Sequence, residues 1–240
     1  MTTISASNYQ IVDRQAWLAA HQDHLVKEKA FTKQREAMAE SRRELPWLEL
    51  TEPYIFDTPD GETNLAGLFG GRSQLVVYHF MFGPDWGEEG CPNCSFWADN
   101  YNGTPVHLAH RDTAFTAISR ASLDQIAAYR SRMGWDFPWV SSGRCDFNYD
   151  LGVSAHQEDV DAGAKVYNLE TAAPMGTESP GVSAFARDGD RVFLTYQVPA
   201  RGLDLFNGTY HLLDITAKGR DEDELPWPMA WLHRHDAYPD

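Results

Sequence analysis

Residues 78–100 of the 240-residue chain read YHFMFGPDWGEEGCPNCSFWADN. They continue an almost unbroken apolar run over 74–82, which is typical of a strand buried on both faces of a mostly parallel sheet. A loop rich in Gly, Pro and acidic residues follows, and Cys91 and Cys94 then open a predicted helix. The stretch therefore predicts a strand, a turn and a helix, with a Cys-x-x-Cys pair where the helix begins.

The composition is that of an acidic globular protein. Hydrophobic residues make up 42% of the chain, aromatic residues 12%, and the formal net charge is −15. Such a chain can form a core, whereas its negative charge disfavours binding to phosphates or to an anionic lipid surface. We therefore expect neither a nucleic acid nor a membrane as partner.

The N-terminal sequence carries no secretory pattern. Residues 1–24 lack a basic region followed by an apolar one, and no window approaches the roughly 18 apolar residues of a membrane span. We expect a cytoplasmic location. Three cysteines are too few for a disulfide scaffold, and Cys145 stands apart from the other two, so we expect it to be a free thiol.

Two parts of the chain are expected, a helical extension at residues 1–46 and a main domain at residues 47–240. Asp13 predicts the N-cap of a helix that reaches about Leu45, and Pro46 prevents its continuation. Apolar residues recur near helical spacing within it. We favour an amphipathic helix that packs on the main domain of its own chain. The alternative is an arm that forms a homodimer.

The main domain alternates predicted strands and helices. Strands are predicted at 47–50, 54–56, 74–82, 113–119, 137–141, 182–187 and 191–198, and helices at 95–102, 106–111, 123–133 and 203–215. Alternation in the first half implies right-handed crossovers and a parallel core. Asp188-Gly189 predicts a hairpin between the last two strands, and residues 156–176 a long excursion.

Three segments resemble the peroxiredoxin and thiol-disulfide-reductase branch of the thioredoxin fold. FDTPDGETNLAGLFGGRSQLVVYHF (56–80) resembles the segment that leads to the redox cysteine, and TAFTAISRASLDQIAAYRSRMGWDFPWVSS (113–142) the next β-α-β unit. PGVSAFARDGDRVF (180–193) resembles the final hairpin of the reductases, whose cis-proline lies nine residues before the turn glycine. Pro180 and Gly189 have this spacing.

The whole chain is similar to a bacterial family, the domain of unknown function 899 family. The matching motifs include YHFMFGPDW (78–86), GCPNCSFWADN (90–100), RMGWDFPWVSS (132–142), ARGLDLFNGTY (200–210) and PWPMAW (226–231). The resemblance implies an α/β, thioredoxin-like fold, with a central mixed, largely parallel sheet flanked by helices. It implies no particular reaction, so the chemistry must be argued from the site.

The Cys-x-x-Cys pair beside a β-α pattern favours a thiol–disulfide oxidoreductase. Cys91, at the start of the helix, is the expected nucleophile, because the helix dipole and free N–H groups stabilise a thiolate there. Cys94, one turn later, would resolve a mixed disulfide. The resemblance implies that Pro180, if cis, faces the two sulfurs. The expected substrate is a thiol or disulfide of a protein or a small molecule.

The acidic residues near Cys91 in the sequence weigh against a reactive thiolate. Asp85, Glu88 and Glu89 precede Cys91, and no Lys or Arg lies between residues 72 and 111. Carboxylates oppose thiolate formation unless they point away. A non-enzymatic protein that retains two thiols therefore stays an alternative.

A peroxidase is a further alternative. Peroxiredoxin-like sites carry P-x-x-x-T-x-x-C, and Pro84 has the correct distance from Cys91. Glu88 occupies the threonine position, however, so the hydroxyl that orients the peroxide is missing.

A metal site is the last alternative. Cys91 and Cys94 could supply half of a tetrahedral zinc or copper site, with His79 and His107, or His110, as the remaining candidate ligands. For each of these histidines we favour a structural or surface role, as we do for His233 and His235. The chain has no Gly-rich nucleotide motif, so neither a nicotinamide nor a flavin is implied.

Overall fold

The computed structural model describes residues 4–168, 170–171 and 176–239. The chain forms two compact units, residues 1–46 and residues 47–240.

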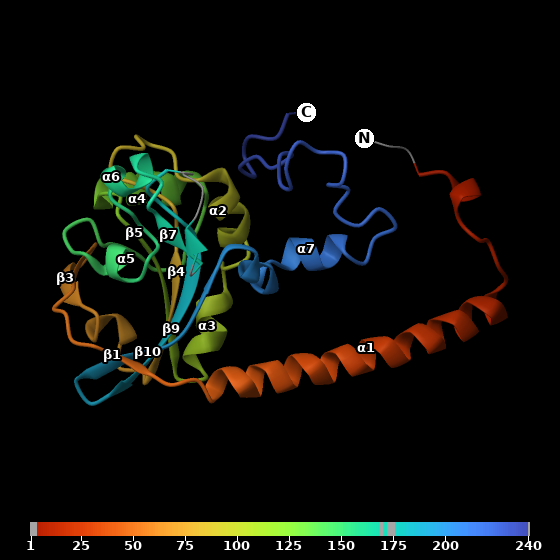
Figure 1. The fold of residues 1–240 in the computed structure, drawn as a ribbon, viewed down its shortest axis with the longest axis horizontal. Helices are drawn as coiled ribbons and strands as arrows, with labels where there is room; N and C mark the ends of the chain where they lie inside the picture. Colours follow the sequence, from red (N-terminus) through yellow and green to blue (C-terminus); the bar gives the residue numbers. More distant parts are fainter. Residues whose placement is uncertain (1–3, 169, 172–175, 240) are drawn as a thin grey trace. The chain divides into compact units, whose positions relative to one another are not determined.

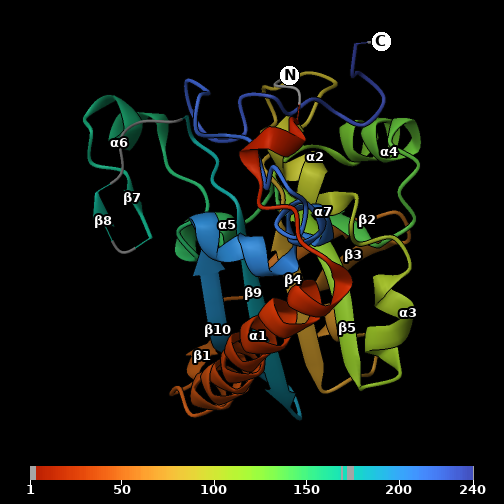
Figure 2. The same cartoon turned by 90° about the vertical axis from the view of Figure 1, so that its right-hand side faces the viewer.

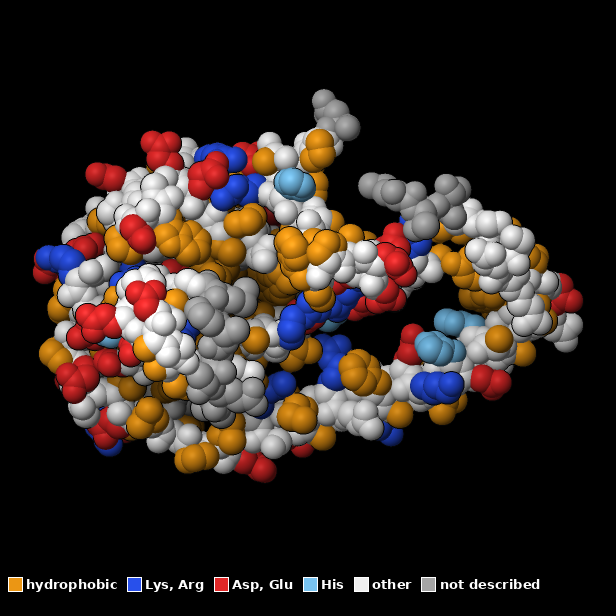
Figure 3. Space-filling model, turned by 45° about the horizontal axis from the view of Figure 1, so that its top comes forward, with side chains coloured by type: hydrophobic (Ala, Val, Ile, Leu, Met, Phe, Trp, Pro, Cys, Tyr) orange, Lys and Arg blue, Asp and Glu red, His pale blue; other side chains and the backbone are white. Residues whose placement is uncertain are grey.

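The first unit is a long helix with a short lead-in. A 3-10 turn, η1 (Ala6–Asn8), precedes α1 (Arg14–Arg43), and the side chain of Asp13 caps α1 by accepting a hydrogen bond from the N–H of Ala16 (2.9 Å). The predicted helix is thereby confirmed. No residue of α1 is buried, and Figure 3 shows apolar side chains along its length. Its packing on the main domain stays a prediction. Among the described residues, no helix combines the length and apolar character that crossing a bilayer requires.

The second unit is built on one mixed sheet with the strand order β1-β10-β9-β4-β5-β6-β2-β3 (Figure 1). Its strands are β1 (Leu48–Leu50), β2 (Ile55–Thr58), β3 (Gly61–Asn64), β4 (Gln74–His79), β5 (Thr113–Ser119), β6 (Trp139–Ser141), β9 (Gly181–Asp188) and β10 (Arg191–Pro199). A separate ribbon joins β7 (Val166–Tyr167) to β8 (Glu170–Thr171).

Parallel pairing in the described sheet is confined to β4, β5 and β6. β9 lies antiparallel to β4, β10 to β9, β1 to β10, β2 to β6 and β3 to β2. The mixed sheet is confirmed, but the expectation of a largely parallel sheet is wrong outside this centre. The reason is that hairpins, which can only be antiparallel, extend the sheet at both edges.

Helices and turns cover both faces of the sheet. They are η2 (Gly67–Phe69), α2 (Pro92–Ala98), α3 (Thr104–Ala109), α4 (Leu123–Arg132), α5 (Phe147–Asp150), α6 (Gln157–Asp161), η3 (Ala200–Phe206) and α7 (Gly208–Leu213). α2, α3 and α4 pack over one core cluster, whereas α5 and η2 pack over a second one. Figures 1 and 2 show α2 and α3 on the opposite side of the central strands from α5.

The local signals explain most of these boundaries. Ser122 and Gln125 form a capping box at the start of α4, and Gly189, with φ +61°, turns the β9–β10 hairpin. The predicted continuous helix at 203–215 is wrong, because Asn207 is extended (φ −110°, ψ 99°) and separates η3 from α7. Its side chain caps α7 by accepting from the N–H of Tyr210.

The arrangement as a whole is thioredoxin-like. A buried strand, β4, leads to the helix that begins after Cys91, a β-α-β path continues to the parallel strands β5 and β6, and an antiparallel hairpin lies beside β4. The predicted fold class is confirmed. The fold places the Cys-x-x-Cys pair at the carboxyl end of the central strand, where α/β sheets commonly bind ligands.

Candidate functional site

Cys91 and Cys94 lie together at the start of α2. The N–H of Cys91 donates to the carbonyl of Met81 (3.1 Å), and its Sγ accepts from the N–H of Cys94 (3.4 Å). Pro92 occupies the first helical position, where a missing N–H costs little. Both cysteines are free thiols, and both are buried. Cys91 is thereby held as the N-cap residue of α2, with its sulfur turned back toward the helix.

Gly90, immediately before the pair, is required by close packing. A Cβ there would lie 2.6 Å from Cε1 of Phe80 and 2.9 Å from Cε1 of Tyr129. Only glycine lets the chain pass between these rings without moving them. The rings therefore fix the path of the backbone into Cys91.

The pKa values of the two thiols are shifted in opposite directions. A hydrogen bond from the Cys94 thiol lowers the pKa of Cys91, and the backbone N–H groups of Cys94 and Asn93 and the charge of Arg234 act in the same direction, against burial. Burial raises the pKa of Cys94 well above its usual range, and the hydrogen bond to Cys91 adds to this effect. Cys91 is therefore the thiol that ionises first.

Arg234 approaches the site from the C-terminal part of the chain. Its guanidinium donates to the carbonyl of Gly90 (2.7 Å) and to the hydroxyl of Tyr129 (2.8 Å). It also pairs with Glu89 (3.1 Å), which Arg132 binds as well (2.7 Å). No Lys or Arg lies near Cys91 in the sequence, but two arginines distant in sequence reach this region in space and pair with Glu89.

The other two acidic residues near the pair in sequence lie at the surface. Asp85 and Glu88 are exposed, so water screens their charges. Glu88 offers no hydroxyl at the position where the peroxidase motif requires threonine. The carbonyl of Pro84 accepts from the side chain of Gln125 (3.3 Å), which ties this loop to α4.

A cavity of about 360 Å³ opens beside the two cysteines. Most of its wall is apolar or aromatic. The side chains and backbone that line it, apart from the cysteines, belong to Tyr78, Met81, Asn93, Trp97, Lys165, Tyr167, Glu178, Ser179, Pro180, Ala200, Arg201, Leu203 and Met229. This volume suits a small-molecule ligand. We call it the thiol pocket.

Pro180 lines the thiol pocket, just before β9 begins. No cis peptide bond occurs among the described residues, so the bond to Pro180 is trans and the cis condition is not met. The carbonyl of Pro180 accepts from the hydroxyl of Tyr167 (2.6 Å), and this hydroxyl accepts from the N–H of Ala200 (2.6 Å). Tyr167 thereby joins two walls of the pocket.

A second wall of the thiol pocket carries charge. Glu178, 2% exposed, accepts from Arg120 (2.9 Å) and from the hydroxyl of Ser154 (2.7 Å). Lys165, 3% exposed, donates to the carbonyls of Gly176 (2.8 Å) and Glu178 (3.4 Å). Burial lowers the pKa of Lys165. No sequence motif marked these residues, which lie in or beside the long excursion.

The C-terminal part of the chain closes the pocket on its third side. Nε1 of Trp97 donates to the carbonyl of Leu203 (2.8 Å), and Phe96 packs edge-on against Tyr210 and Trp231. We call residues 200–231 the covering segment. Glu222 fastens it, because the Glu222 carboxylate accepts hydrogen bonds from the Tyr210 hydroxyl, the Met229 N–H and Nε1 of Trp231. Of the aromatic residues that the sequence places around the pair, Phe82, Phe96, Trp97 and Tyr101 are buried, and Trp97 also lines the pocket.

The candidate metal ligands do not gather. His79 and Tyr78 are neighbours on β4 and point to opposite faces, so His79 packs against Phe147, away from the cysteines. His107 is exposed on α3, as is His110 just after it. No group of three or more His, Cys, Asp or Glu within the described residues could hold a metal ion.

The remaining predicted residues lie outside the pocket. Nε2 of His79 is bonded to the hydroxyl of Ser183 (2.7 Å), so its role is structural. Cys145 packs with the second core cluster. His233 and His235 are both exposed, as predicted, and His235 is also bonded to Asp99 (2.8 Å).

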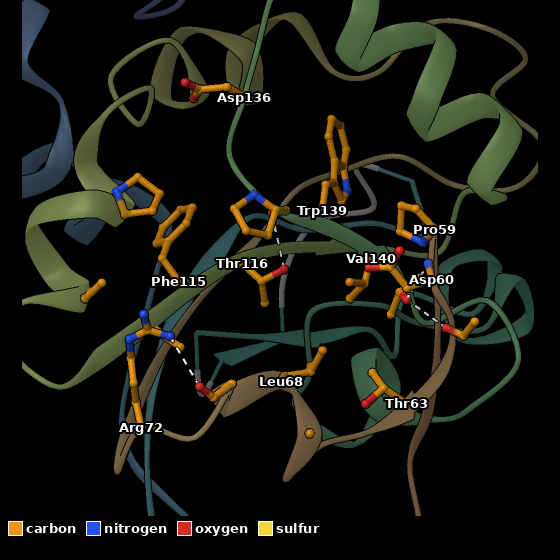
Figure 4. A pocket seen from close by; sticks show the side chains of 18 of the residues that line it. Pro59, Asp60, Thr63, Leu68, Arg72, Phe115, Thr116, Asp136, Trp139 and Val140 are labelled. Atoms are coloured by element: carbon orange, nitrogen blue, oxygen red, sulfur yellow. Dashed lines mark hydrogen bonds between the residues drawn. The ribbon is translucent and has the colours of Figure 1, made fainter.

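A larger cavity, of about 720 Å³, lies elsewhere, between the β2–β3 hairpin and the strands β5 and β6 (Figure 4). Arg72, Thr116 and Trp139 line it, and its described lining residues include no cysteine or histidine. The hydroxyl of Thr116 is already bonded to the carbonyl of Pro138 (3.2 Å). We therefore place the candidate active site at the thiol pocket.

Fold and site together define a thioredoxin-fold protein with a buried Cys-x-x-Cys pair. Residues 6–238 match the family described as bacterial protein of unknown function (DUF899). The chain belongs to this family. No curated protein matches it.

Solved structures similar to the chain include a cysteine-to-serine mutant of peroxiredoxin Q from Xanthomonas campestris, at 12% identity and a TM-score of 0.49, over 71% of this chain and 98% of that one. The peroxidoxin BcpB from Mycobacterium tuberculosis has 13% identity and a TM-score of 0.45, over 65% and 85%. A hypothetical protein from Sinorhizobium meliloti has 14% identity and a TM-score of 0.40, over 66% and 79%. None of these similarities assigns a reaction to the chain.

Proposed function

We propose that the protein is a thiol–disulfide oxidoreductase, in which Cys91 is the nucleophile and Cys94 the resolving thiol. The observation that carries the proposal is the hydrogen-bonded pair itself. The Cys94 thiol and N–H both point at the Cys91 sulfur, so the pKa of Cys91 is lowered while that of Cys94 is raised. An exchange reaction needs this difference, because one thiol must attack while the other waits.

The reaction has two steps. The Cys91 thiolate attacks one sulfur of a substrate disulfide, a mixed disulfide forms, and the released substrate thiolate takes up a proton. Cys94 then loses its proton and attacks the Cys91 sulfur, which releases the second substrate thiol. The protein is oxidised to a Cys91–Cys94 disulfide and the substrate disulfide is reduced to two thiols. The steps run in reverse with a substrate dithiol.

Pro180 shapes the groove in this proposal. It lines the thiol pocket next to both cysteines and is held by the Tyr167 bridge. In the cytoplasmic location that we propose, small thiols would complete the cycle.

Trapping of the mixed disulfide tests the assignment. The Cys94→Ser variant, treated with 2-hydroxyethyl disulfide, should accumulate a stable adduct on Cys91 in intact-mass and peptide analysis. Cys91→Ser should form none, and Cys145→Ser should behave as the unmodified protein does. Adducts on Cys145 alone, or equal labelling of Cys91→Ser, would contradict the roles.

A redox titration separates the enzyme from a non-enzymatic protein. The Cys91–Cys94 disulfide should form reversibly in glutathione buffers, with a potential between about −270 and −120 mV, as in thioredoxin-fold oxidoreductases. Two thiols that stay reduced throughout would favour the non-enzymatic alternative. If the protein is purified with stoichiometric zinc or copper, and the metal is lost when either cysteine is replaced, the metal-binding alternative is favoured.

A further inference from the structure

Two cationic residues line the thiol pocket, Lys165 and Arg201. Lys165 forms no ion pair within the part of the chain that the structure describes, and its hydrogen bonds there go to two carbonyls, those of Gly176 and Glu178. The nearby carboxylate of Glu178 acts on Lys165 through its charge but forms its ion pair with Arg120 (2.5 Å). The other cation on the wall, Arg201, is paired with Asp204 (2.7 Å). Lys165 is therefore the lining group that a ligand anion would meet unpaired.

The burial of Cys91 also disfavours a large substrate. Cys91 is 8% exposed, and the covering segment of Leu203 and Met229 forms part of the wall. A folded protein that presents a disulfide on its surface cannot bring it to such a sulfur unless this segment moves away. The cavity of about 360 Å³ instead fits a slender small molecule.

Apart from Cys91, Lys165 and the other polar groups, the wall of the thiol pocket is apolar. Tyr78, Met81, Trp97 and Leu203 contribute side chains that offer an aliphatic ligand burial of its chain. A ligand that fits the thiol pocket would therefore carry a thiol or disulfide that meets Cys91, an aliphatic chain that meets the apolar wall and a negative charge that meets Lys165.

We propose that the thiol pocket selects a small aliphatic dithiol or disulfide that carries a carboxylate, and that Lys165 binds the carboxylate. This inference rests on the proposed function. Dihydrolipoate is a probe of this chemistry, and dihydrolipoamide is its neutral match, with the same dithiol and the same chain. In the reaction one thiolate of the probe attacks Cys91 of the oxidised protein, and Cys94 leaves and takes up a proton. The second probe thiol then loses its proton and attacks the probe sulfur that is bonded to Cys91, which closes the ring, breaks the mixed disulfide and releases Cys91 as the thiolate.

The test compares the rates at which the two probes reduce the Cys91–Cys94 disulfide, measured by quenching, alkylation and intact mass. Each rate is divided by the rate of the same probe with 2-hydroxyethyl disulfide, which removes differences in intrinsic reactivity. Dihydrolipoate should be about tenfold faster or more, as expected for a hydrogen bond to a charged group. Lys165→Met should abolish this preference, and Lys218→Met, at a lysine paired with Asp221, should keep it.

A second measurement needs no variant at Lys165. Octanoate, which has the charge and chain but no thiol, should slow the alkylation of Cys91 by iodoacetamide in the unmodified protein, whereas octanamide should not.

The outcomes separate the two proposals. If the disulfide forms and both probes reduce it at equal normalised rates, the substrate class is wrong and the oxidoreductase stands. A preference that survives in Lys165→Met would likewise overturn the role of Lys165. If no Cys91–Cys94 disulfide forms, the proposed function itself fails.

Discussion

Arg234 acts on Cys91 in two ways, through its charge and through a hydrogen bond to the residue before it. Its guanidinium holds the carbonyl before Cys91 and contributes to the lowered pKa of the thiol. We expect Arg234→Gln to reduce the rate of Cys91 alkylation at pH 7 several-fold, because a smaller fraction of the thiol is ionised.

The pH profile of alkylation checks this prediction. The midpoint for Cys91 should lie below that of an ordinary thiol in the unmodified protein and shift upward in Arg234→Gln. Arg234→Lys should restore part of the shift, since it keeps the charge. Arg144→Gln, at an exposed arginine paired with Asp57, serves as the control. An unchanged profile in Arg234→Gln would show that the arginine only fastens the chain.

His79 predicts how stability depends on pH. Burial lowers its pKa from 6.5 to about 3. Between these two pH values the unfolded chain binds a proton that the folded chain does not. The contribution of His79 to the free energy of unfolding therefore rises with pH up to about 6.5, and it is lost as the pH falls toward about 3. The slope from this one group is at most about 1.4 kcal/mol per pH unit.

Urea unfolding between pH 4 and pH 6 measures this slope. His79→Phe should flatten it while lowering stability by about 1 kcal/mol, because Ser183 loses its partner. His107→Phe, at an exposed position, controls for the loss of a histidine. An equal slope in His79→Phe and the unmodified protein would contradict the assignment.

Sequence patterns identify residues whose neighbours lie close in the chain, and miss those brought together by folding. The Cys-x-x-Cys spacing and the proline nine residues before a turn glycine predicted Cys91, Cys94 and Pro180, and all three line one pocket. Lys165 and Arg234 belong to no local motif. Their places depend on how the excursion and the covering segment fold back, which no short window records.

At the scale of elements, one buried ion pair connects the end of β5 to the segment before β9. Arg120, just after β5, binds Glu178 two residues before Pro180. Arg120→Met leaves a buried carboxylate without its cation, which costs about 3–5 kcal/mol of stability. The double variant with Glu178→Gln should recover much of this loss, since the unpaired charge is gone.

Denaturant unfolding of the two single variants and the double variant checks this coupling. Arg191→Met, at an exposed arginine paired with Glu49, should cost less than about 1 kcal/mol. Additive losses in the double variant would contradict a specific pair.

Elements with strong local signals were predicted best. β5 occupies the predicted residues, and α4 begins at residue 123, as predicted. β3 was missed, because GETN has no apolar alternation and its register is set by pairing with β2. The break at Asn207 was missed for a similar reason, since the leucines on either side fit one helical period.

At the scale of the whole molecule, Glu222 fastens the covering segment over α2. Glu222→Ala removes the acceptor of three hydrogen bonds, so the second unit should lose about 1–3 kcal/mol. Hydrogen exchange should rise first at Met229 and its neighbours. Glu224→Ala, at an exposed position, is the control. Unchanged exchange there in Glu222→Ala would contradict the fastening role.

The cation that tunes Cys91 lies 144 residues after Gly90 in the chain. A ribosome makes a protein from its N-terminal end at about 5–20 residues per second. The sulfur therefore leaves the ribosome well before Arg234 has been synthesised. During this interval the nascent chain carries a thiol that lacks its charge partner, and the reactive thiolate matures only when translation has passed residue 234.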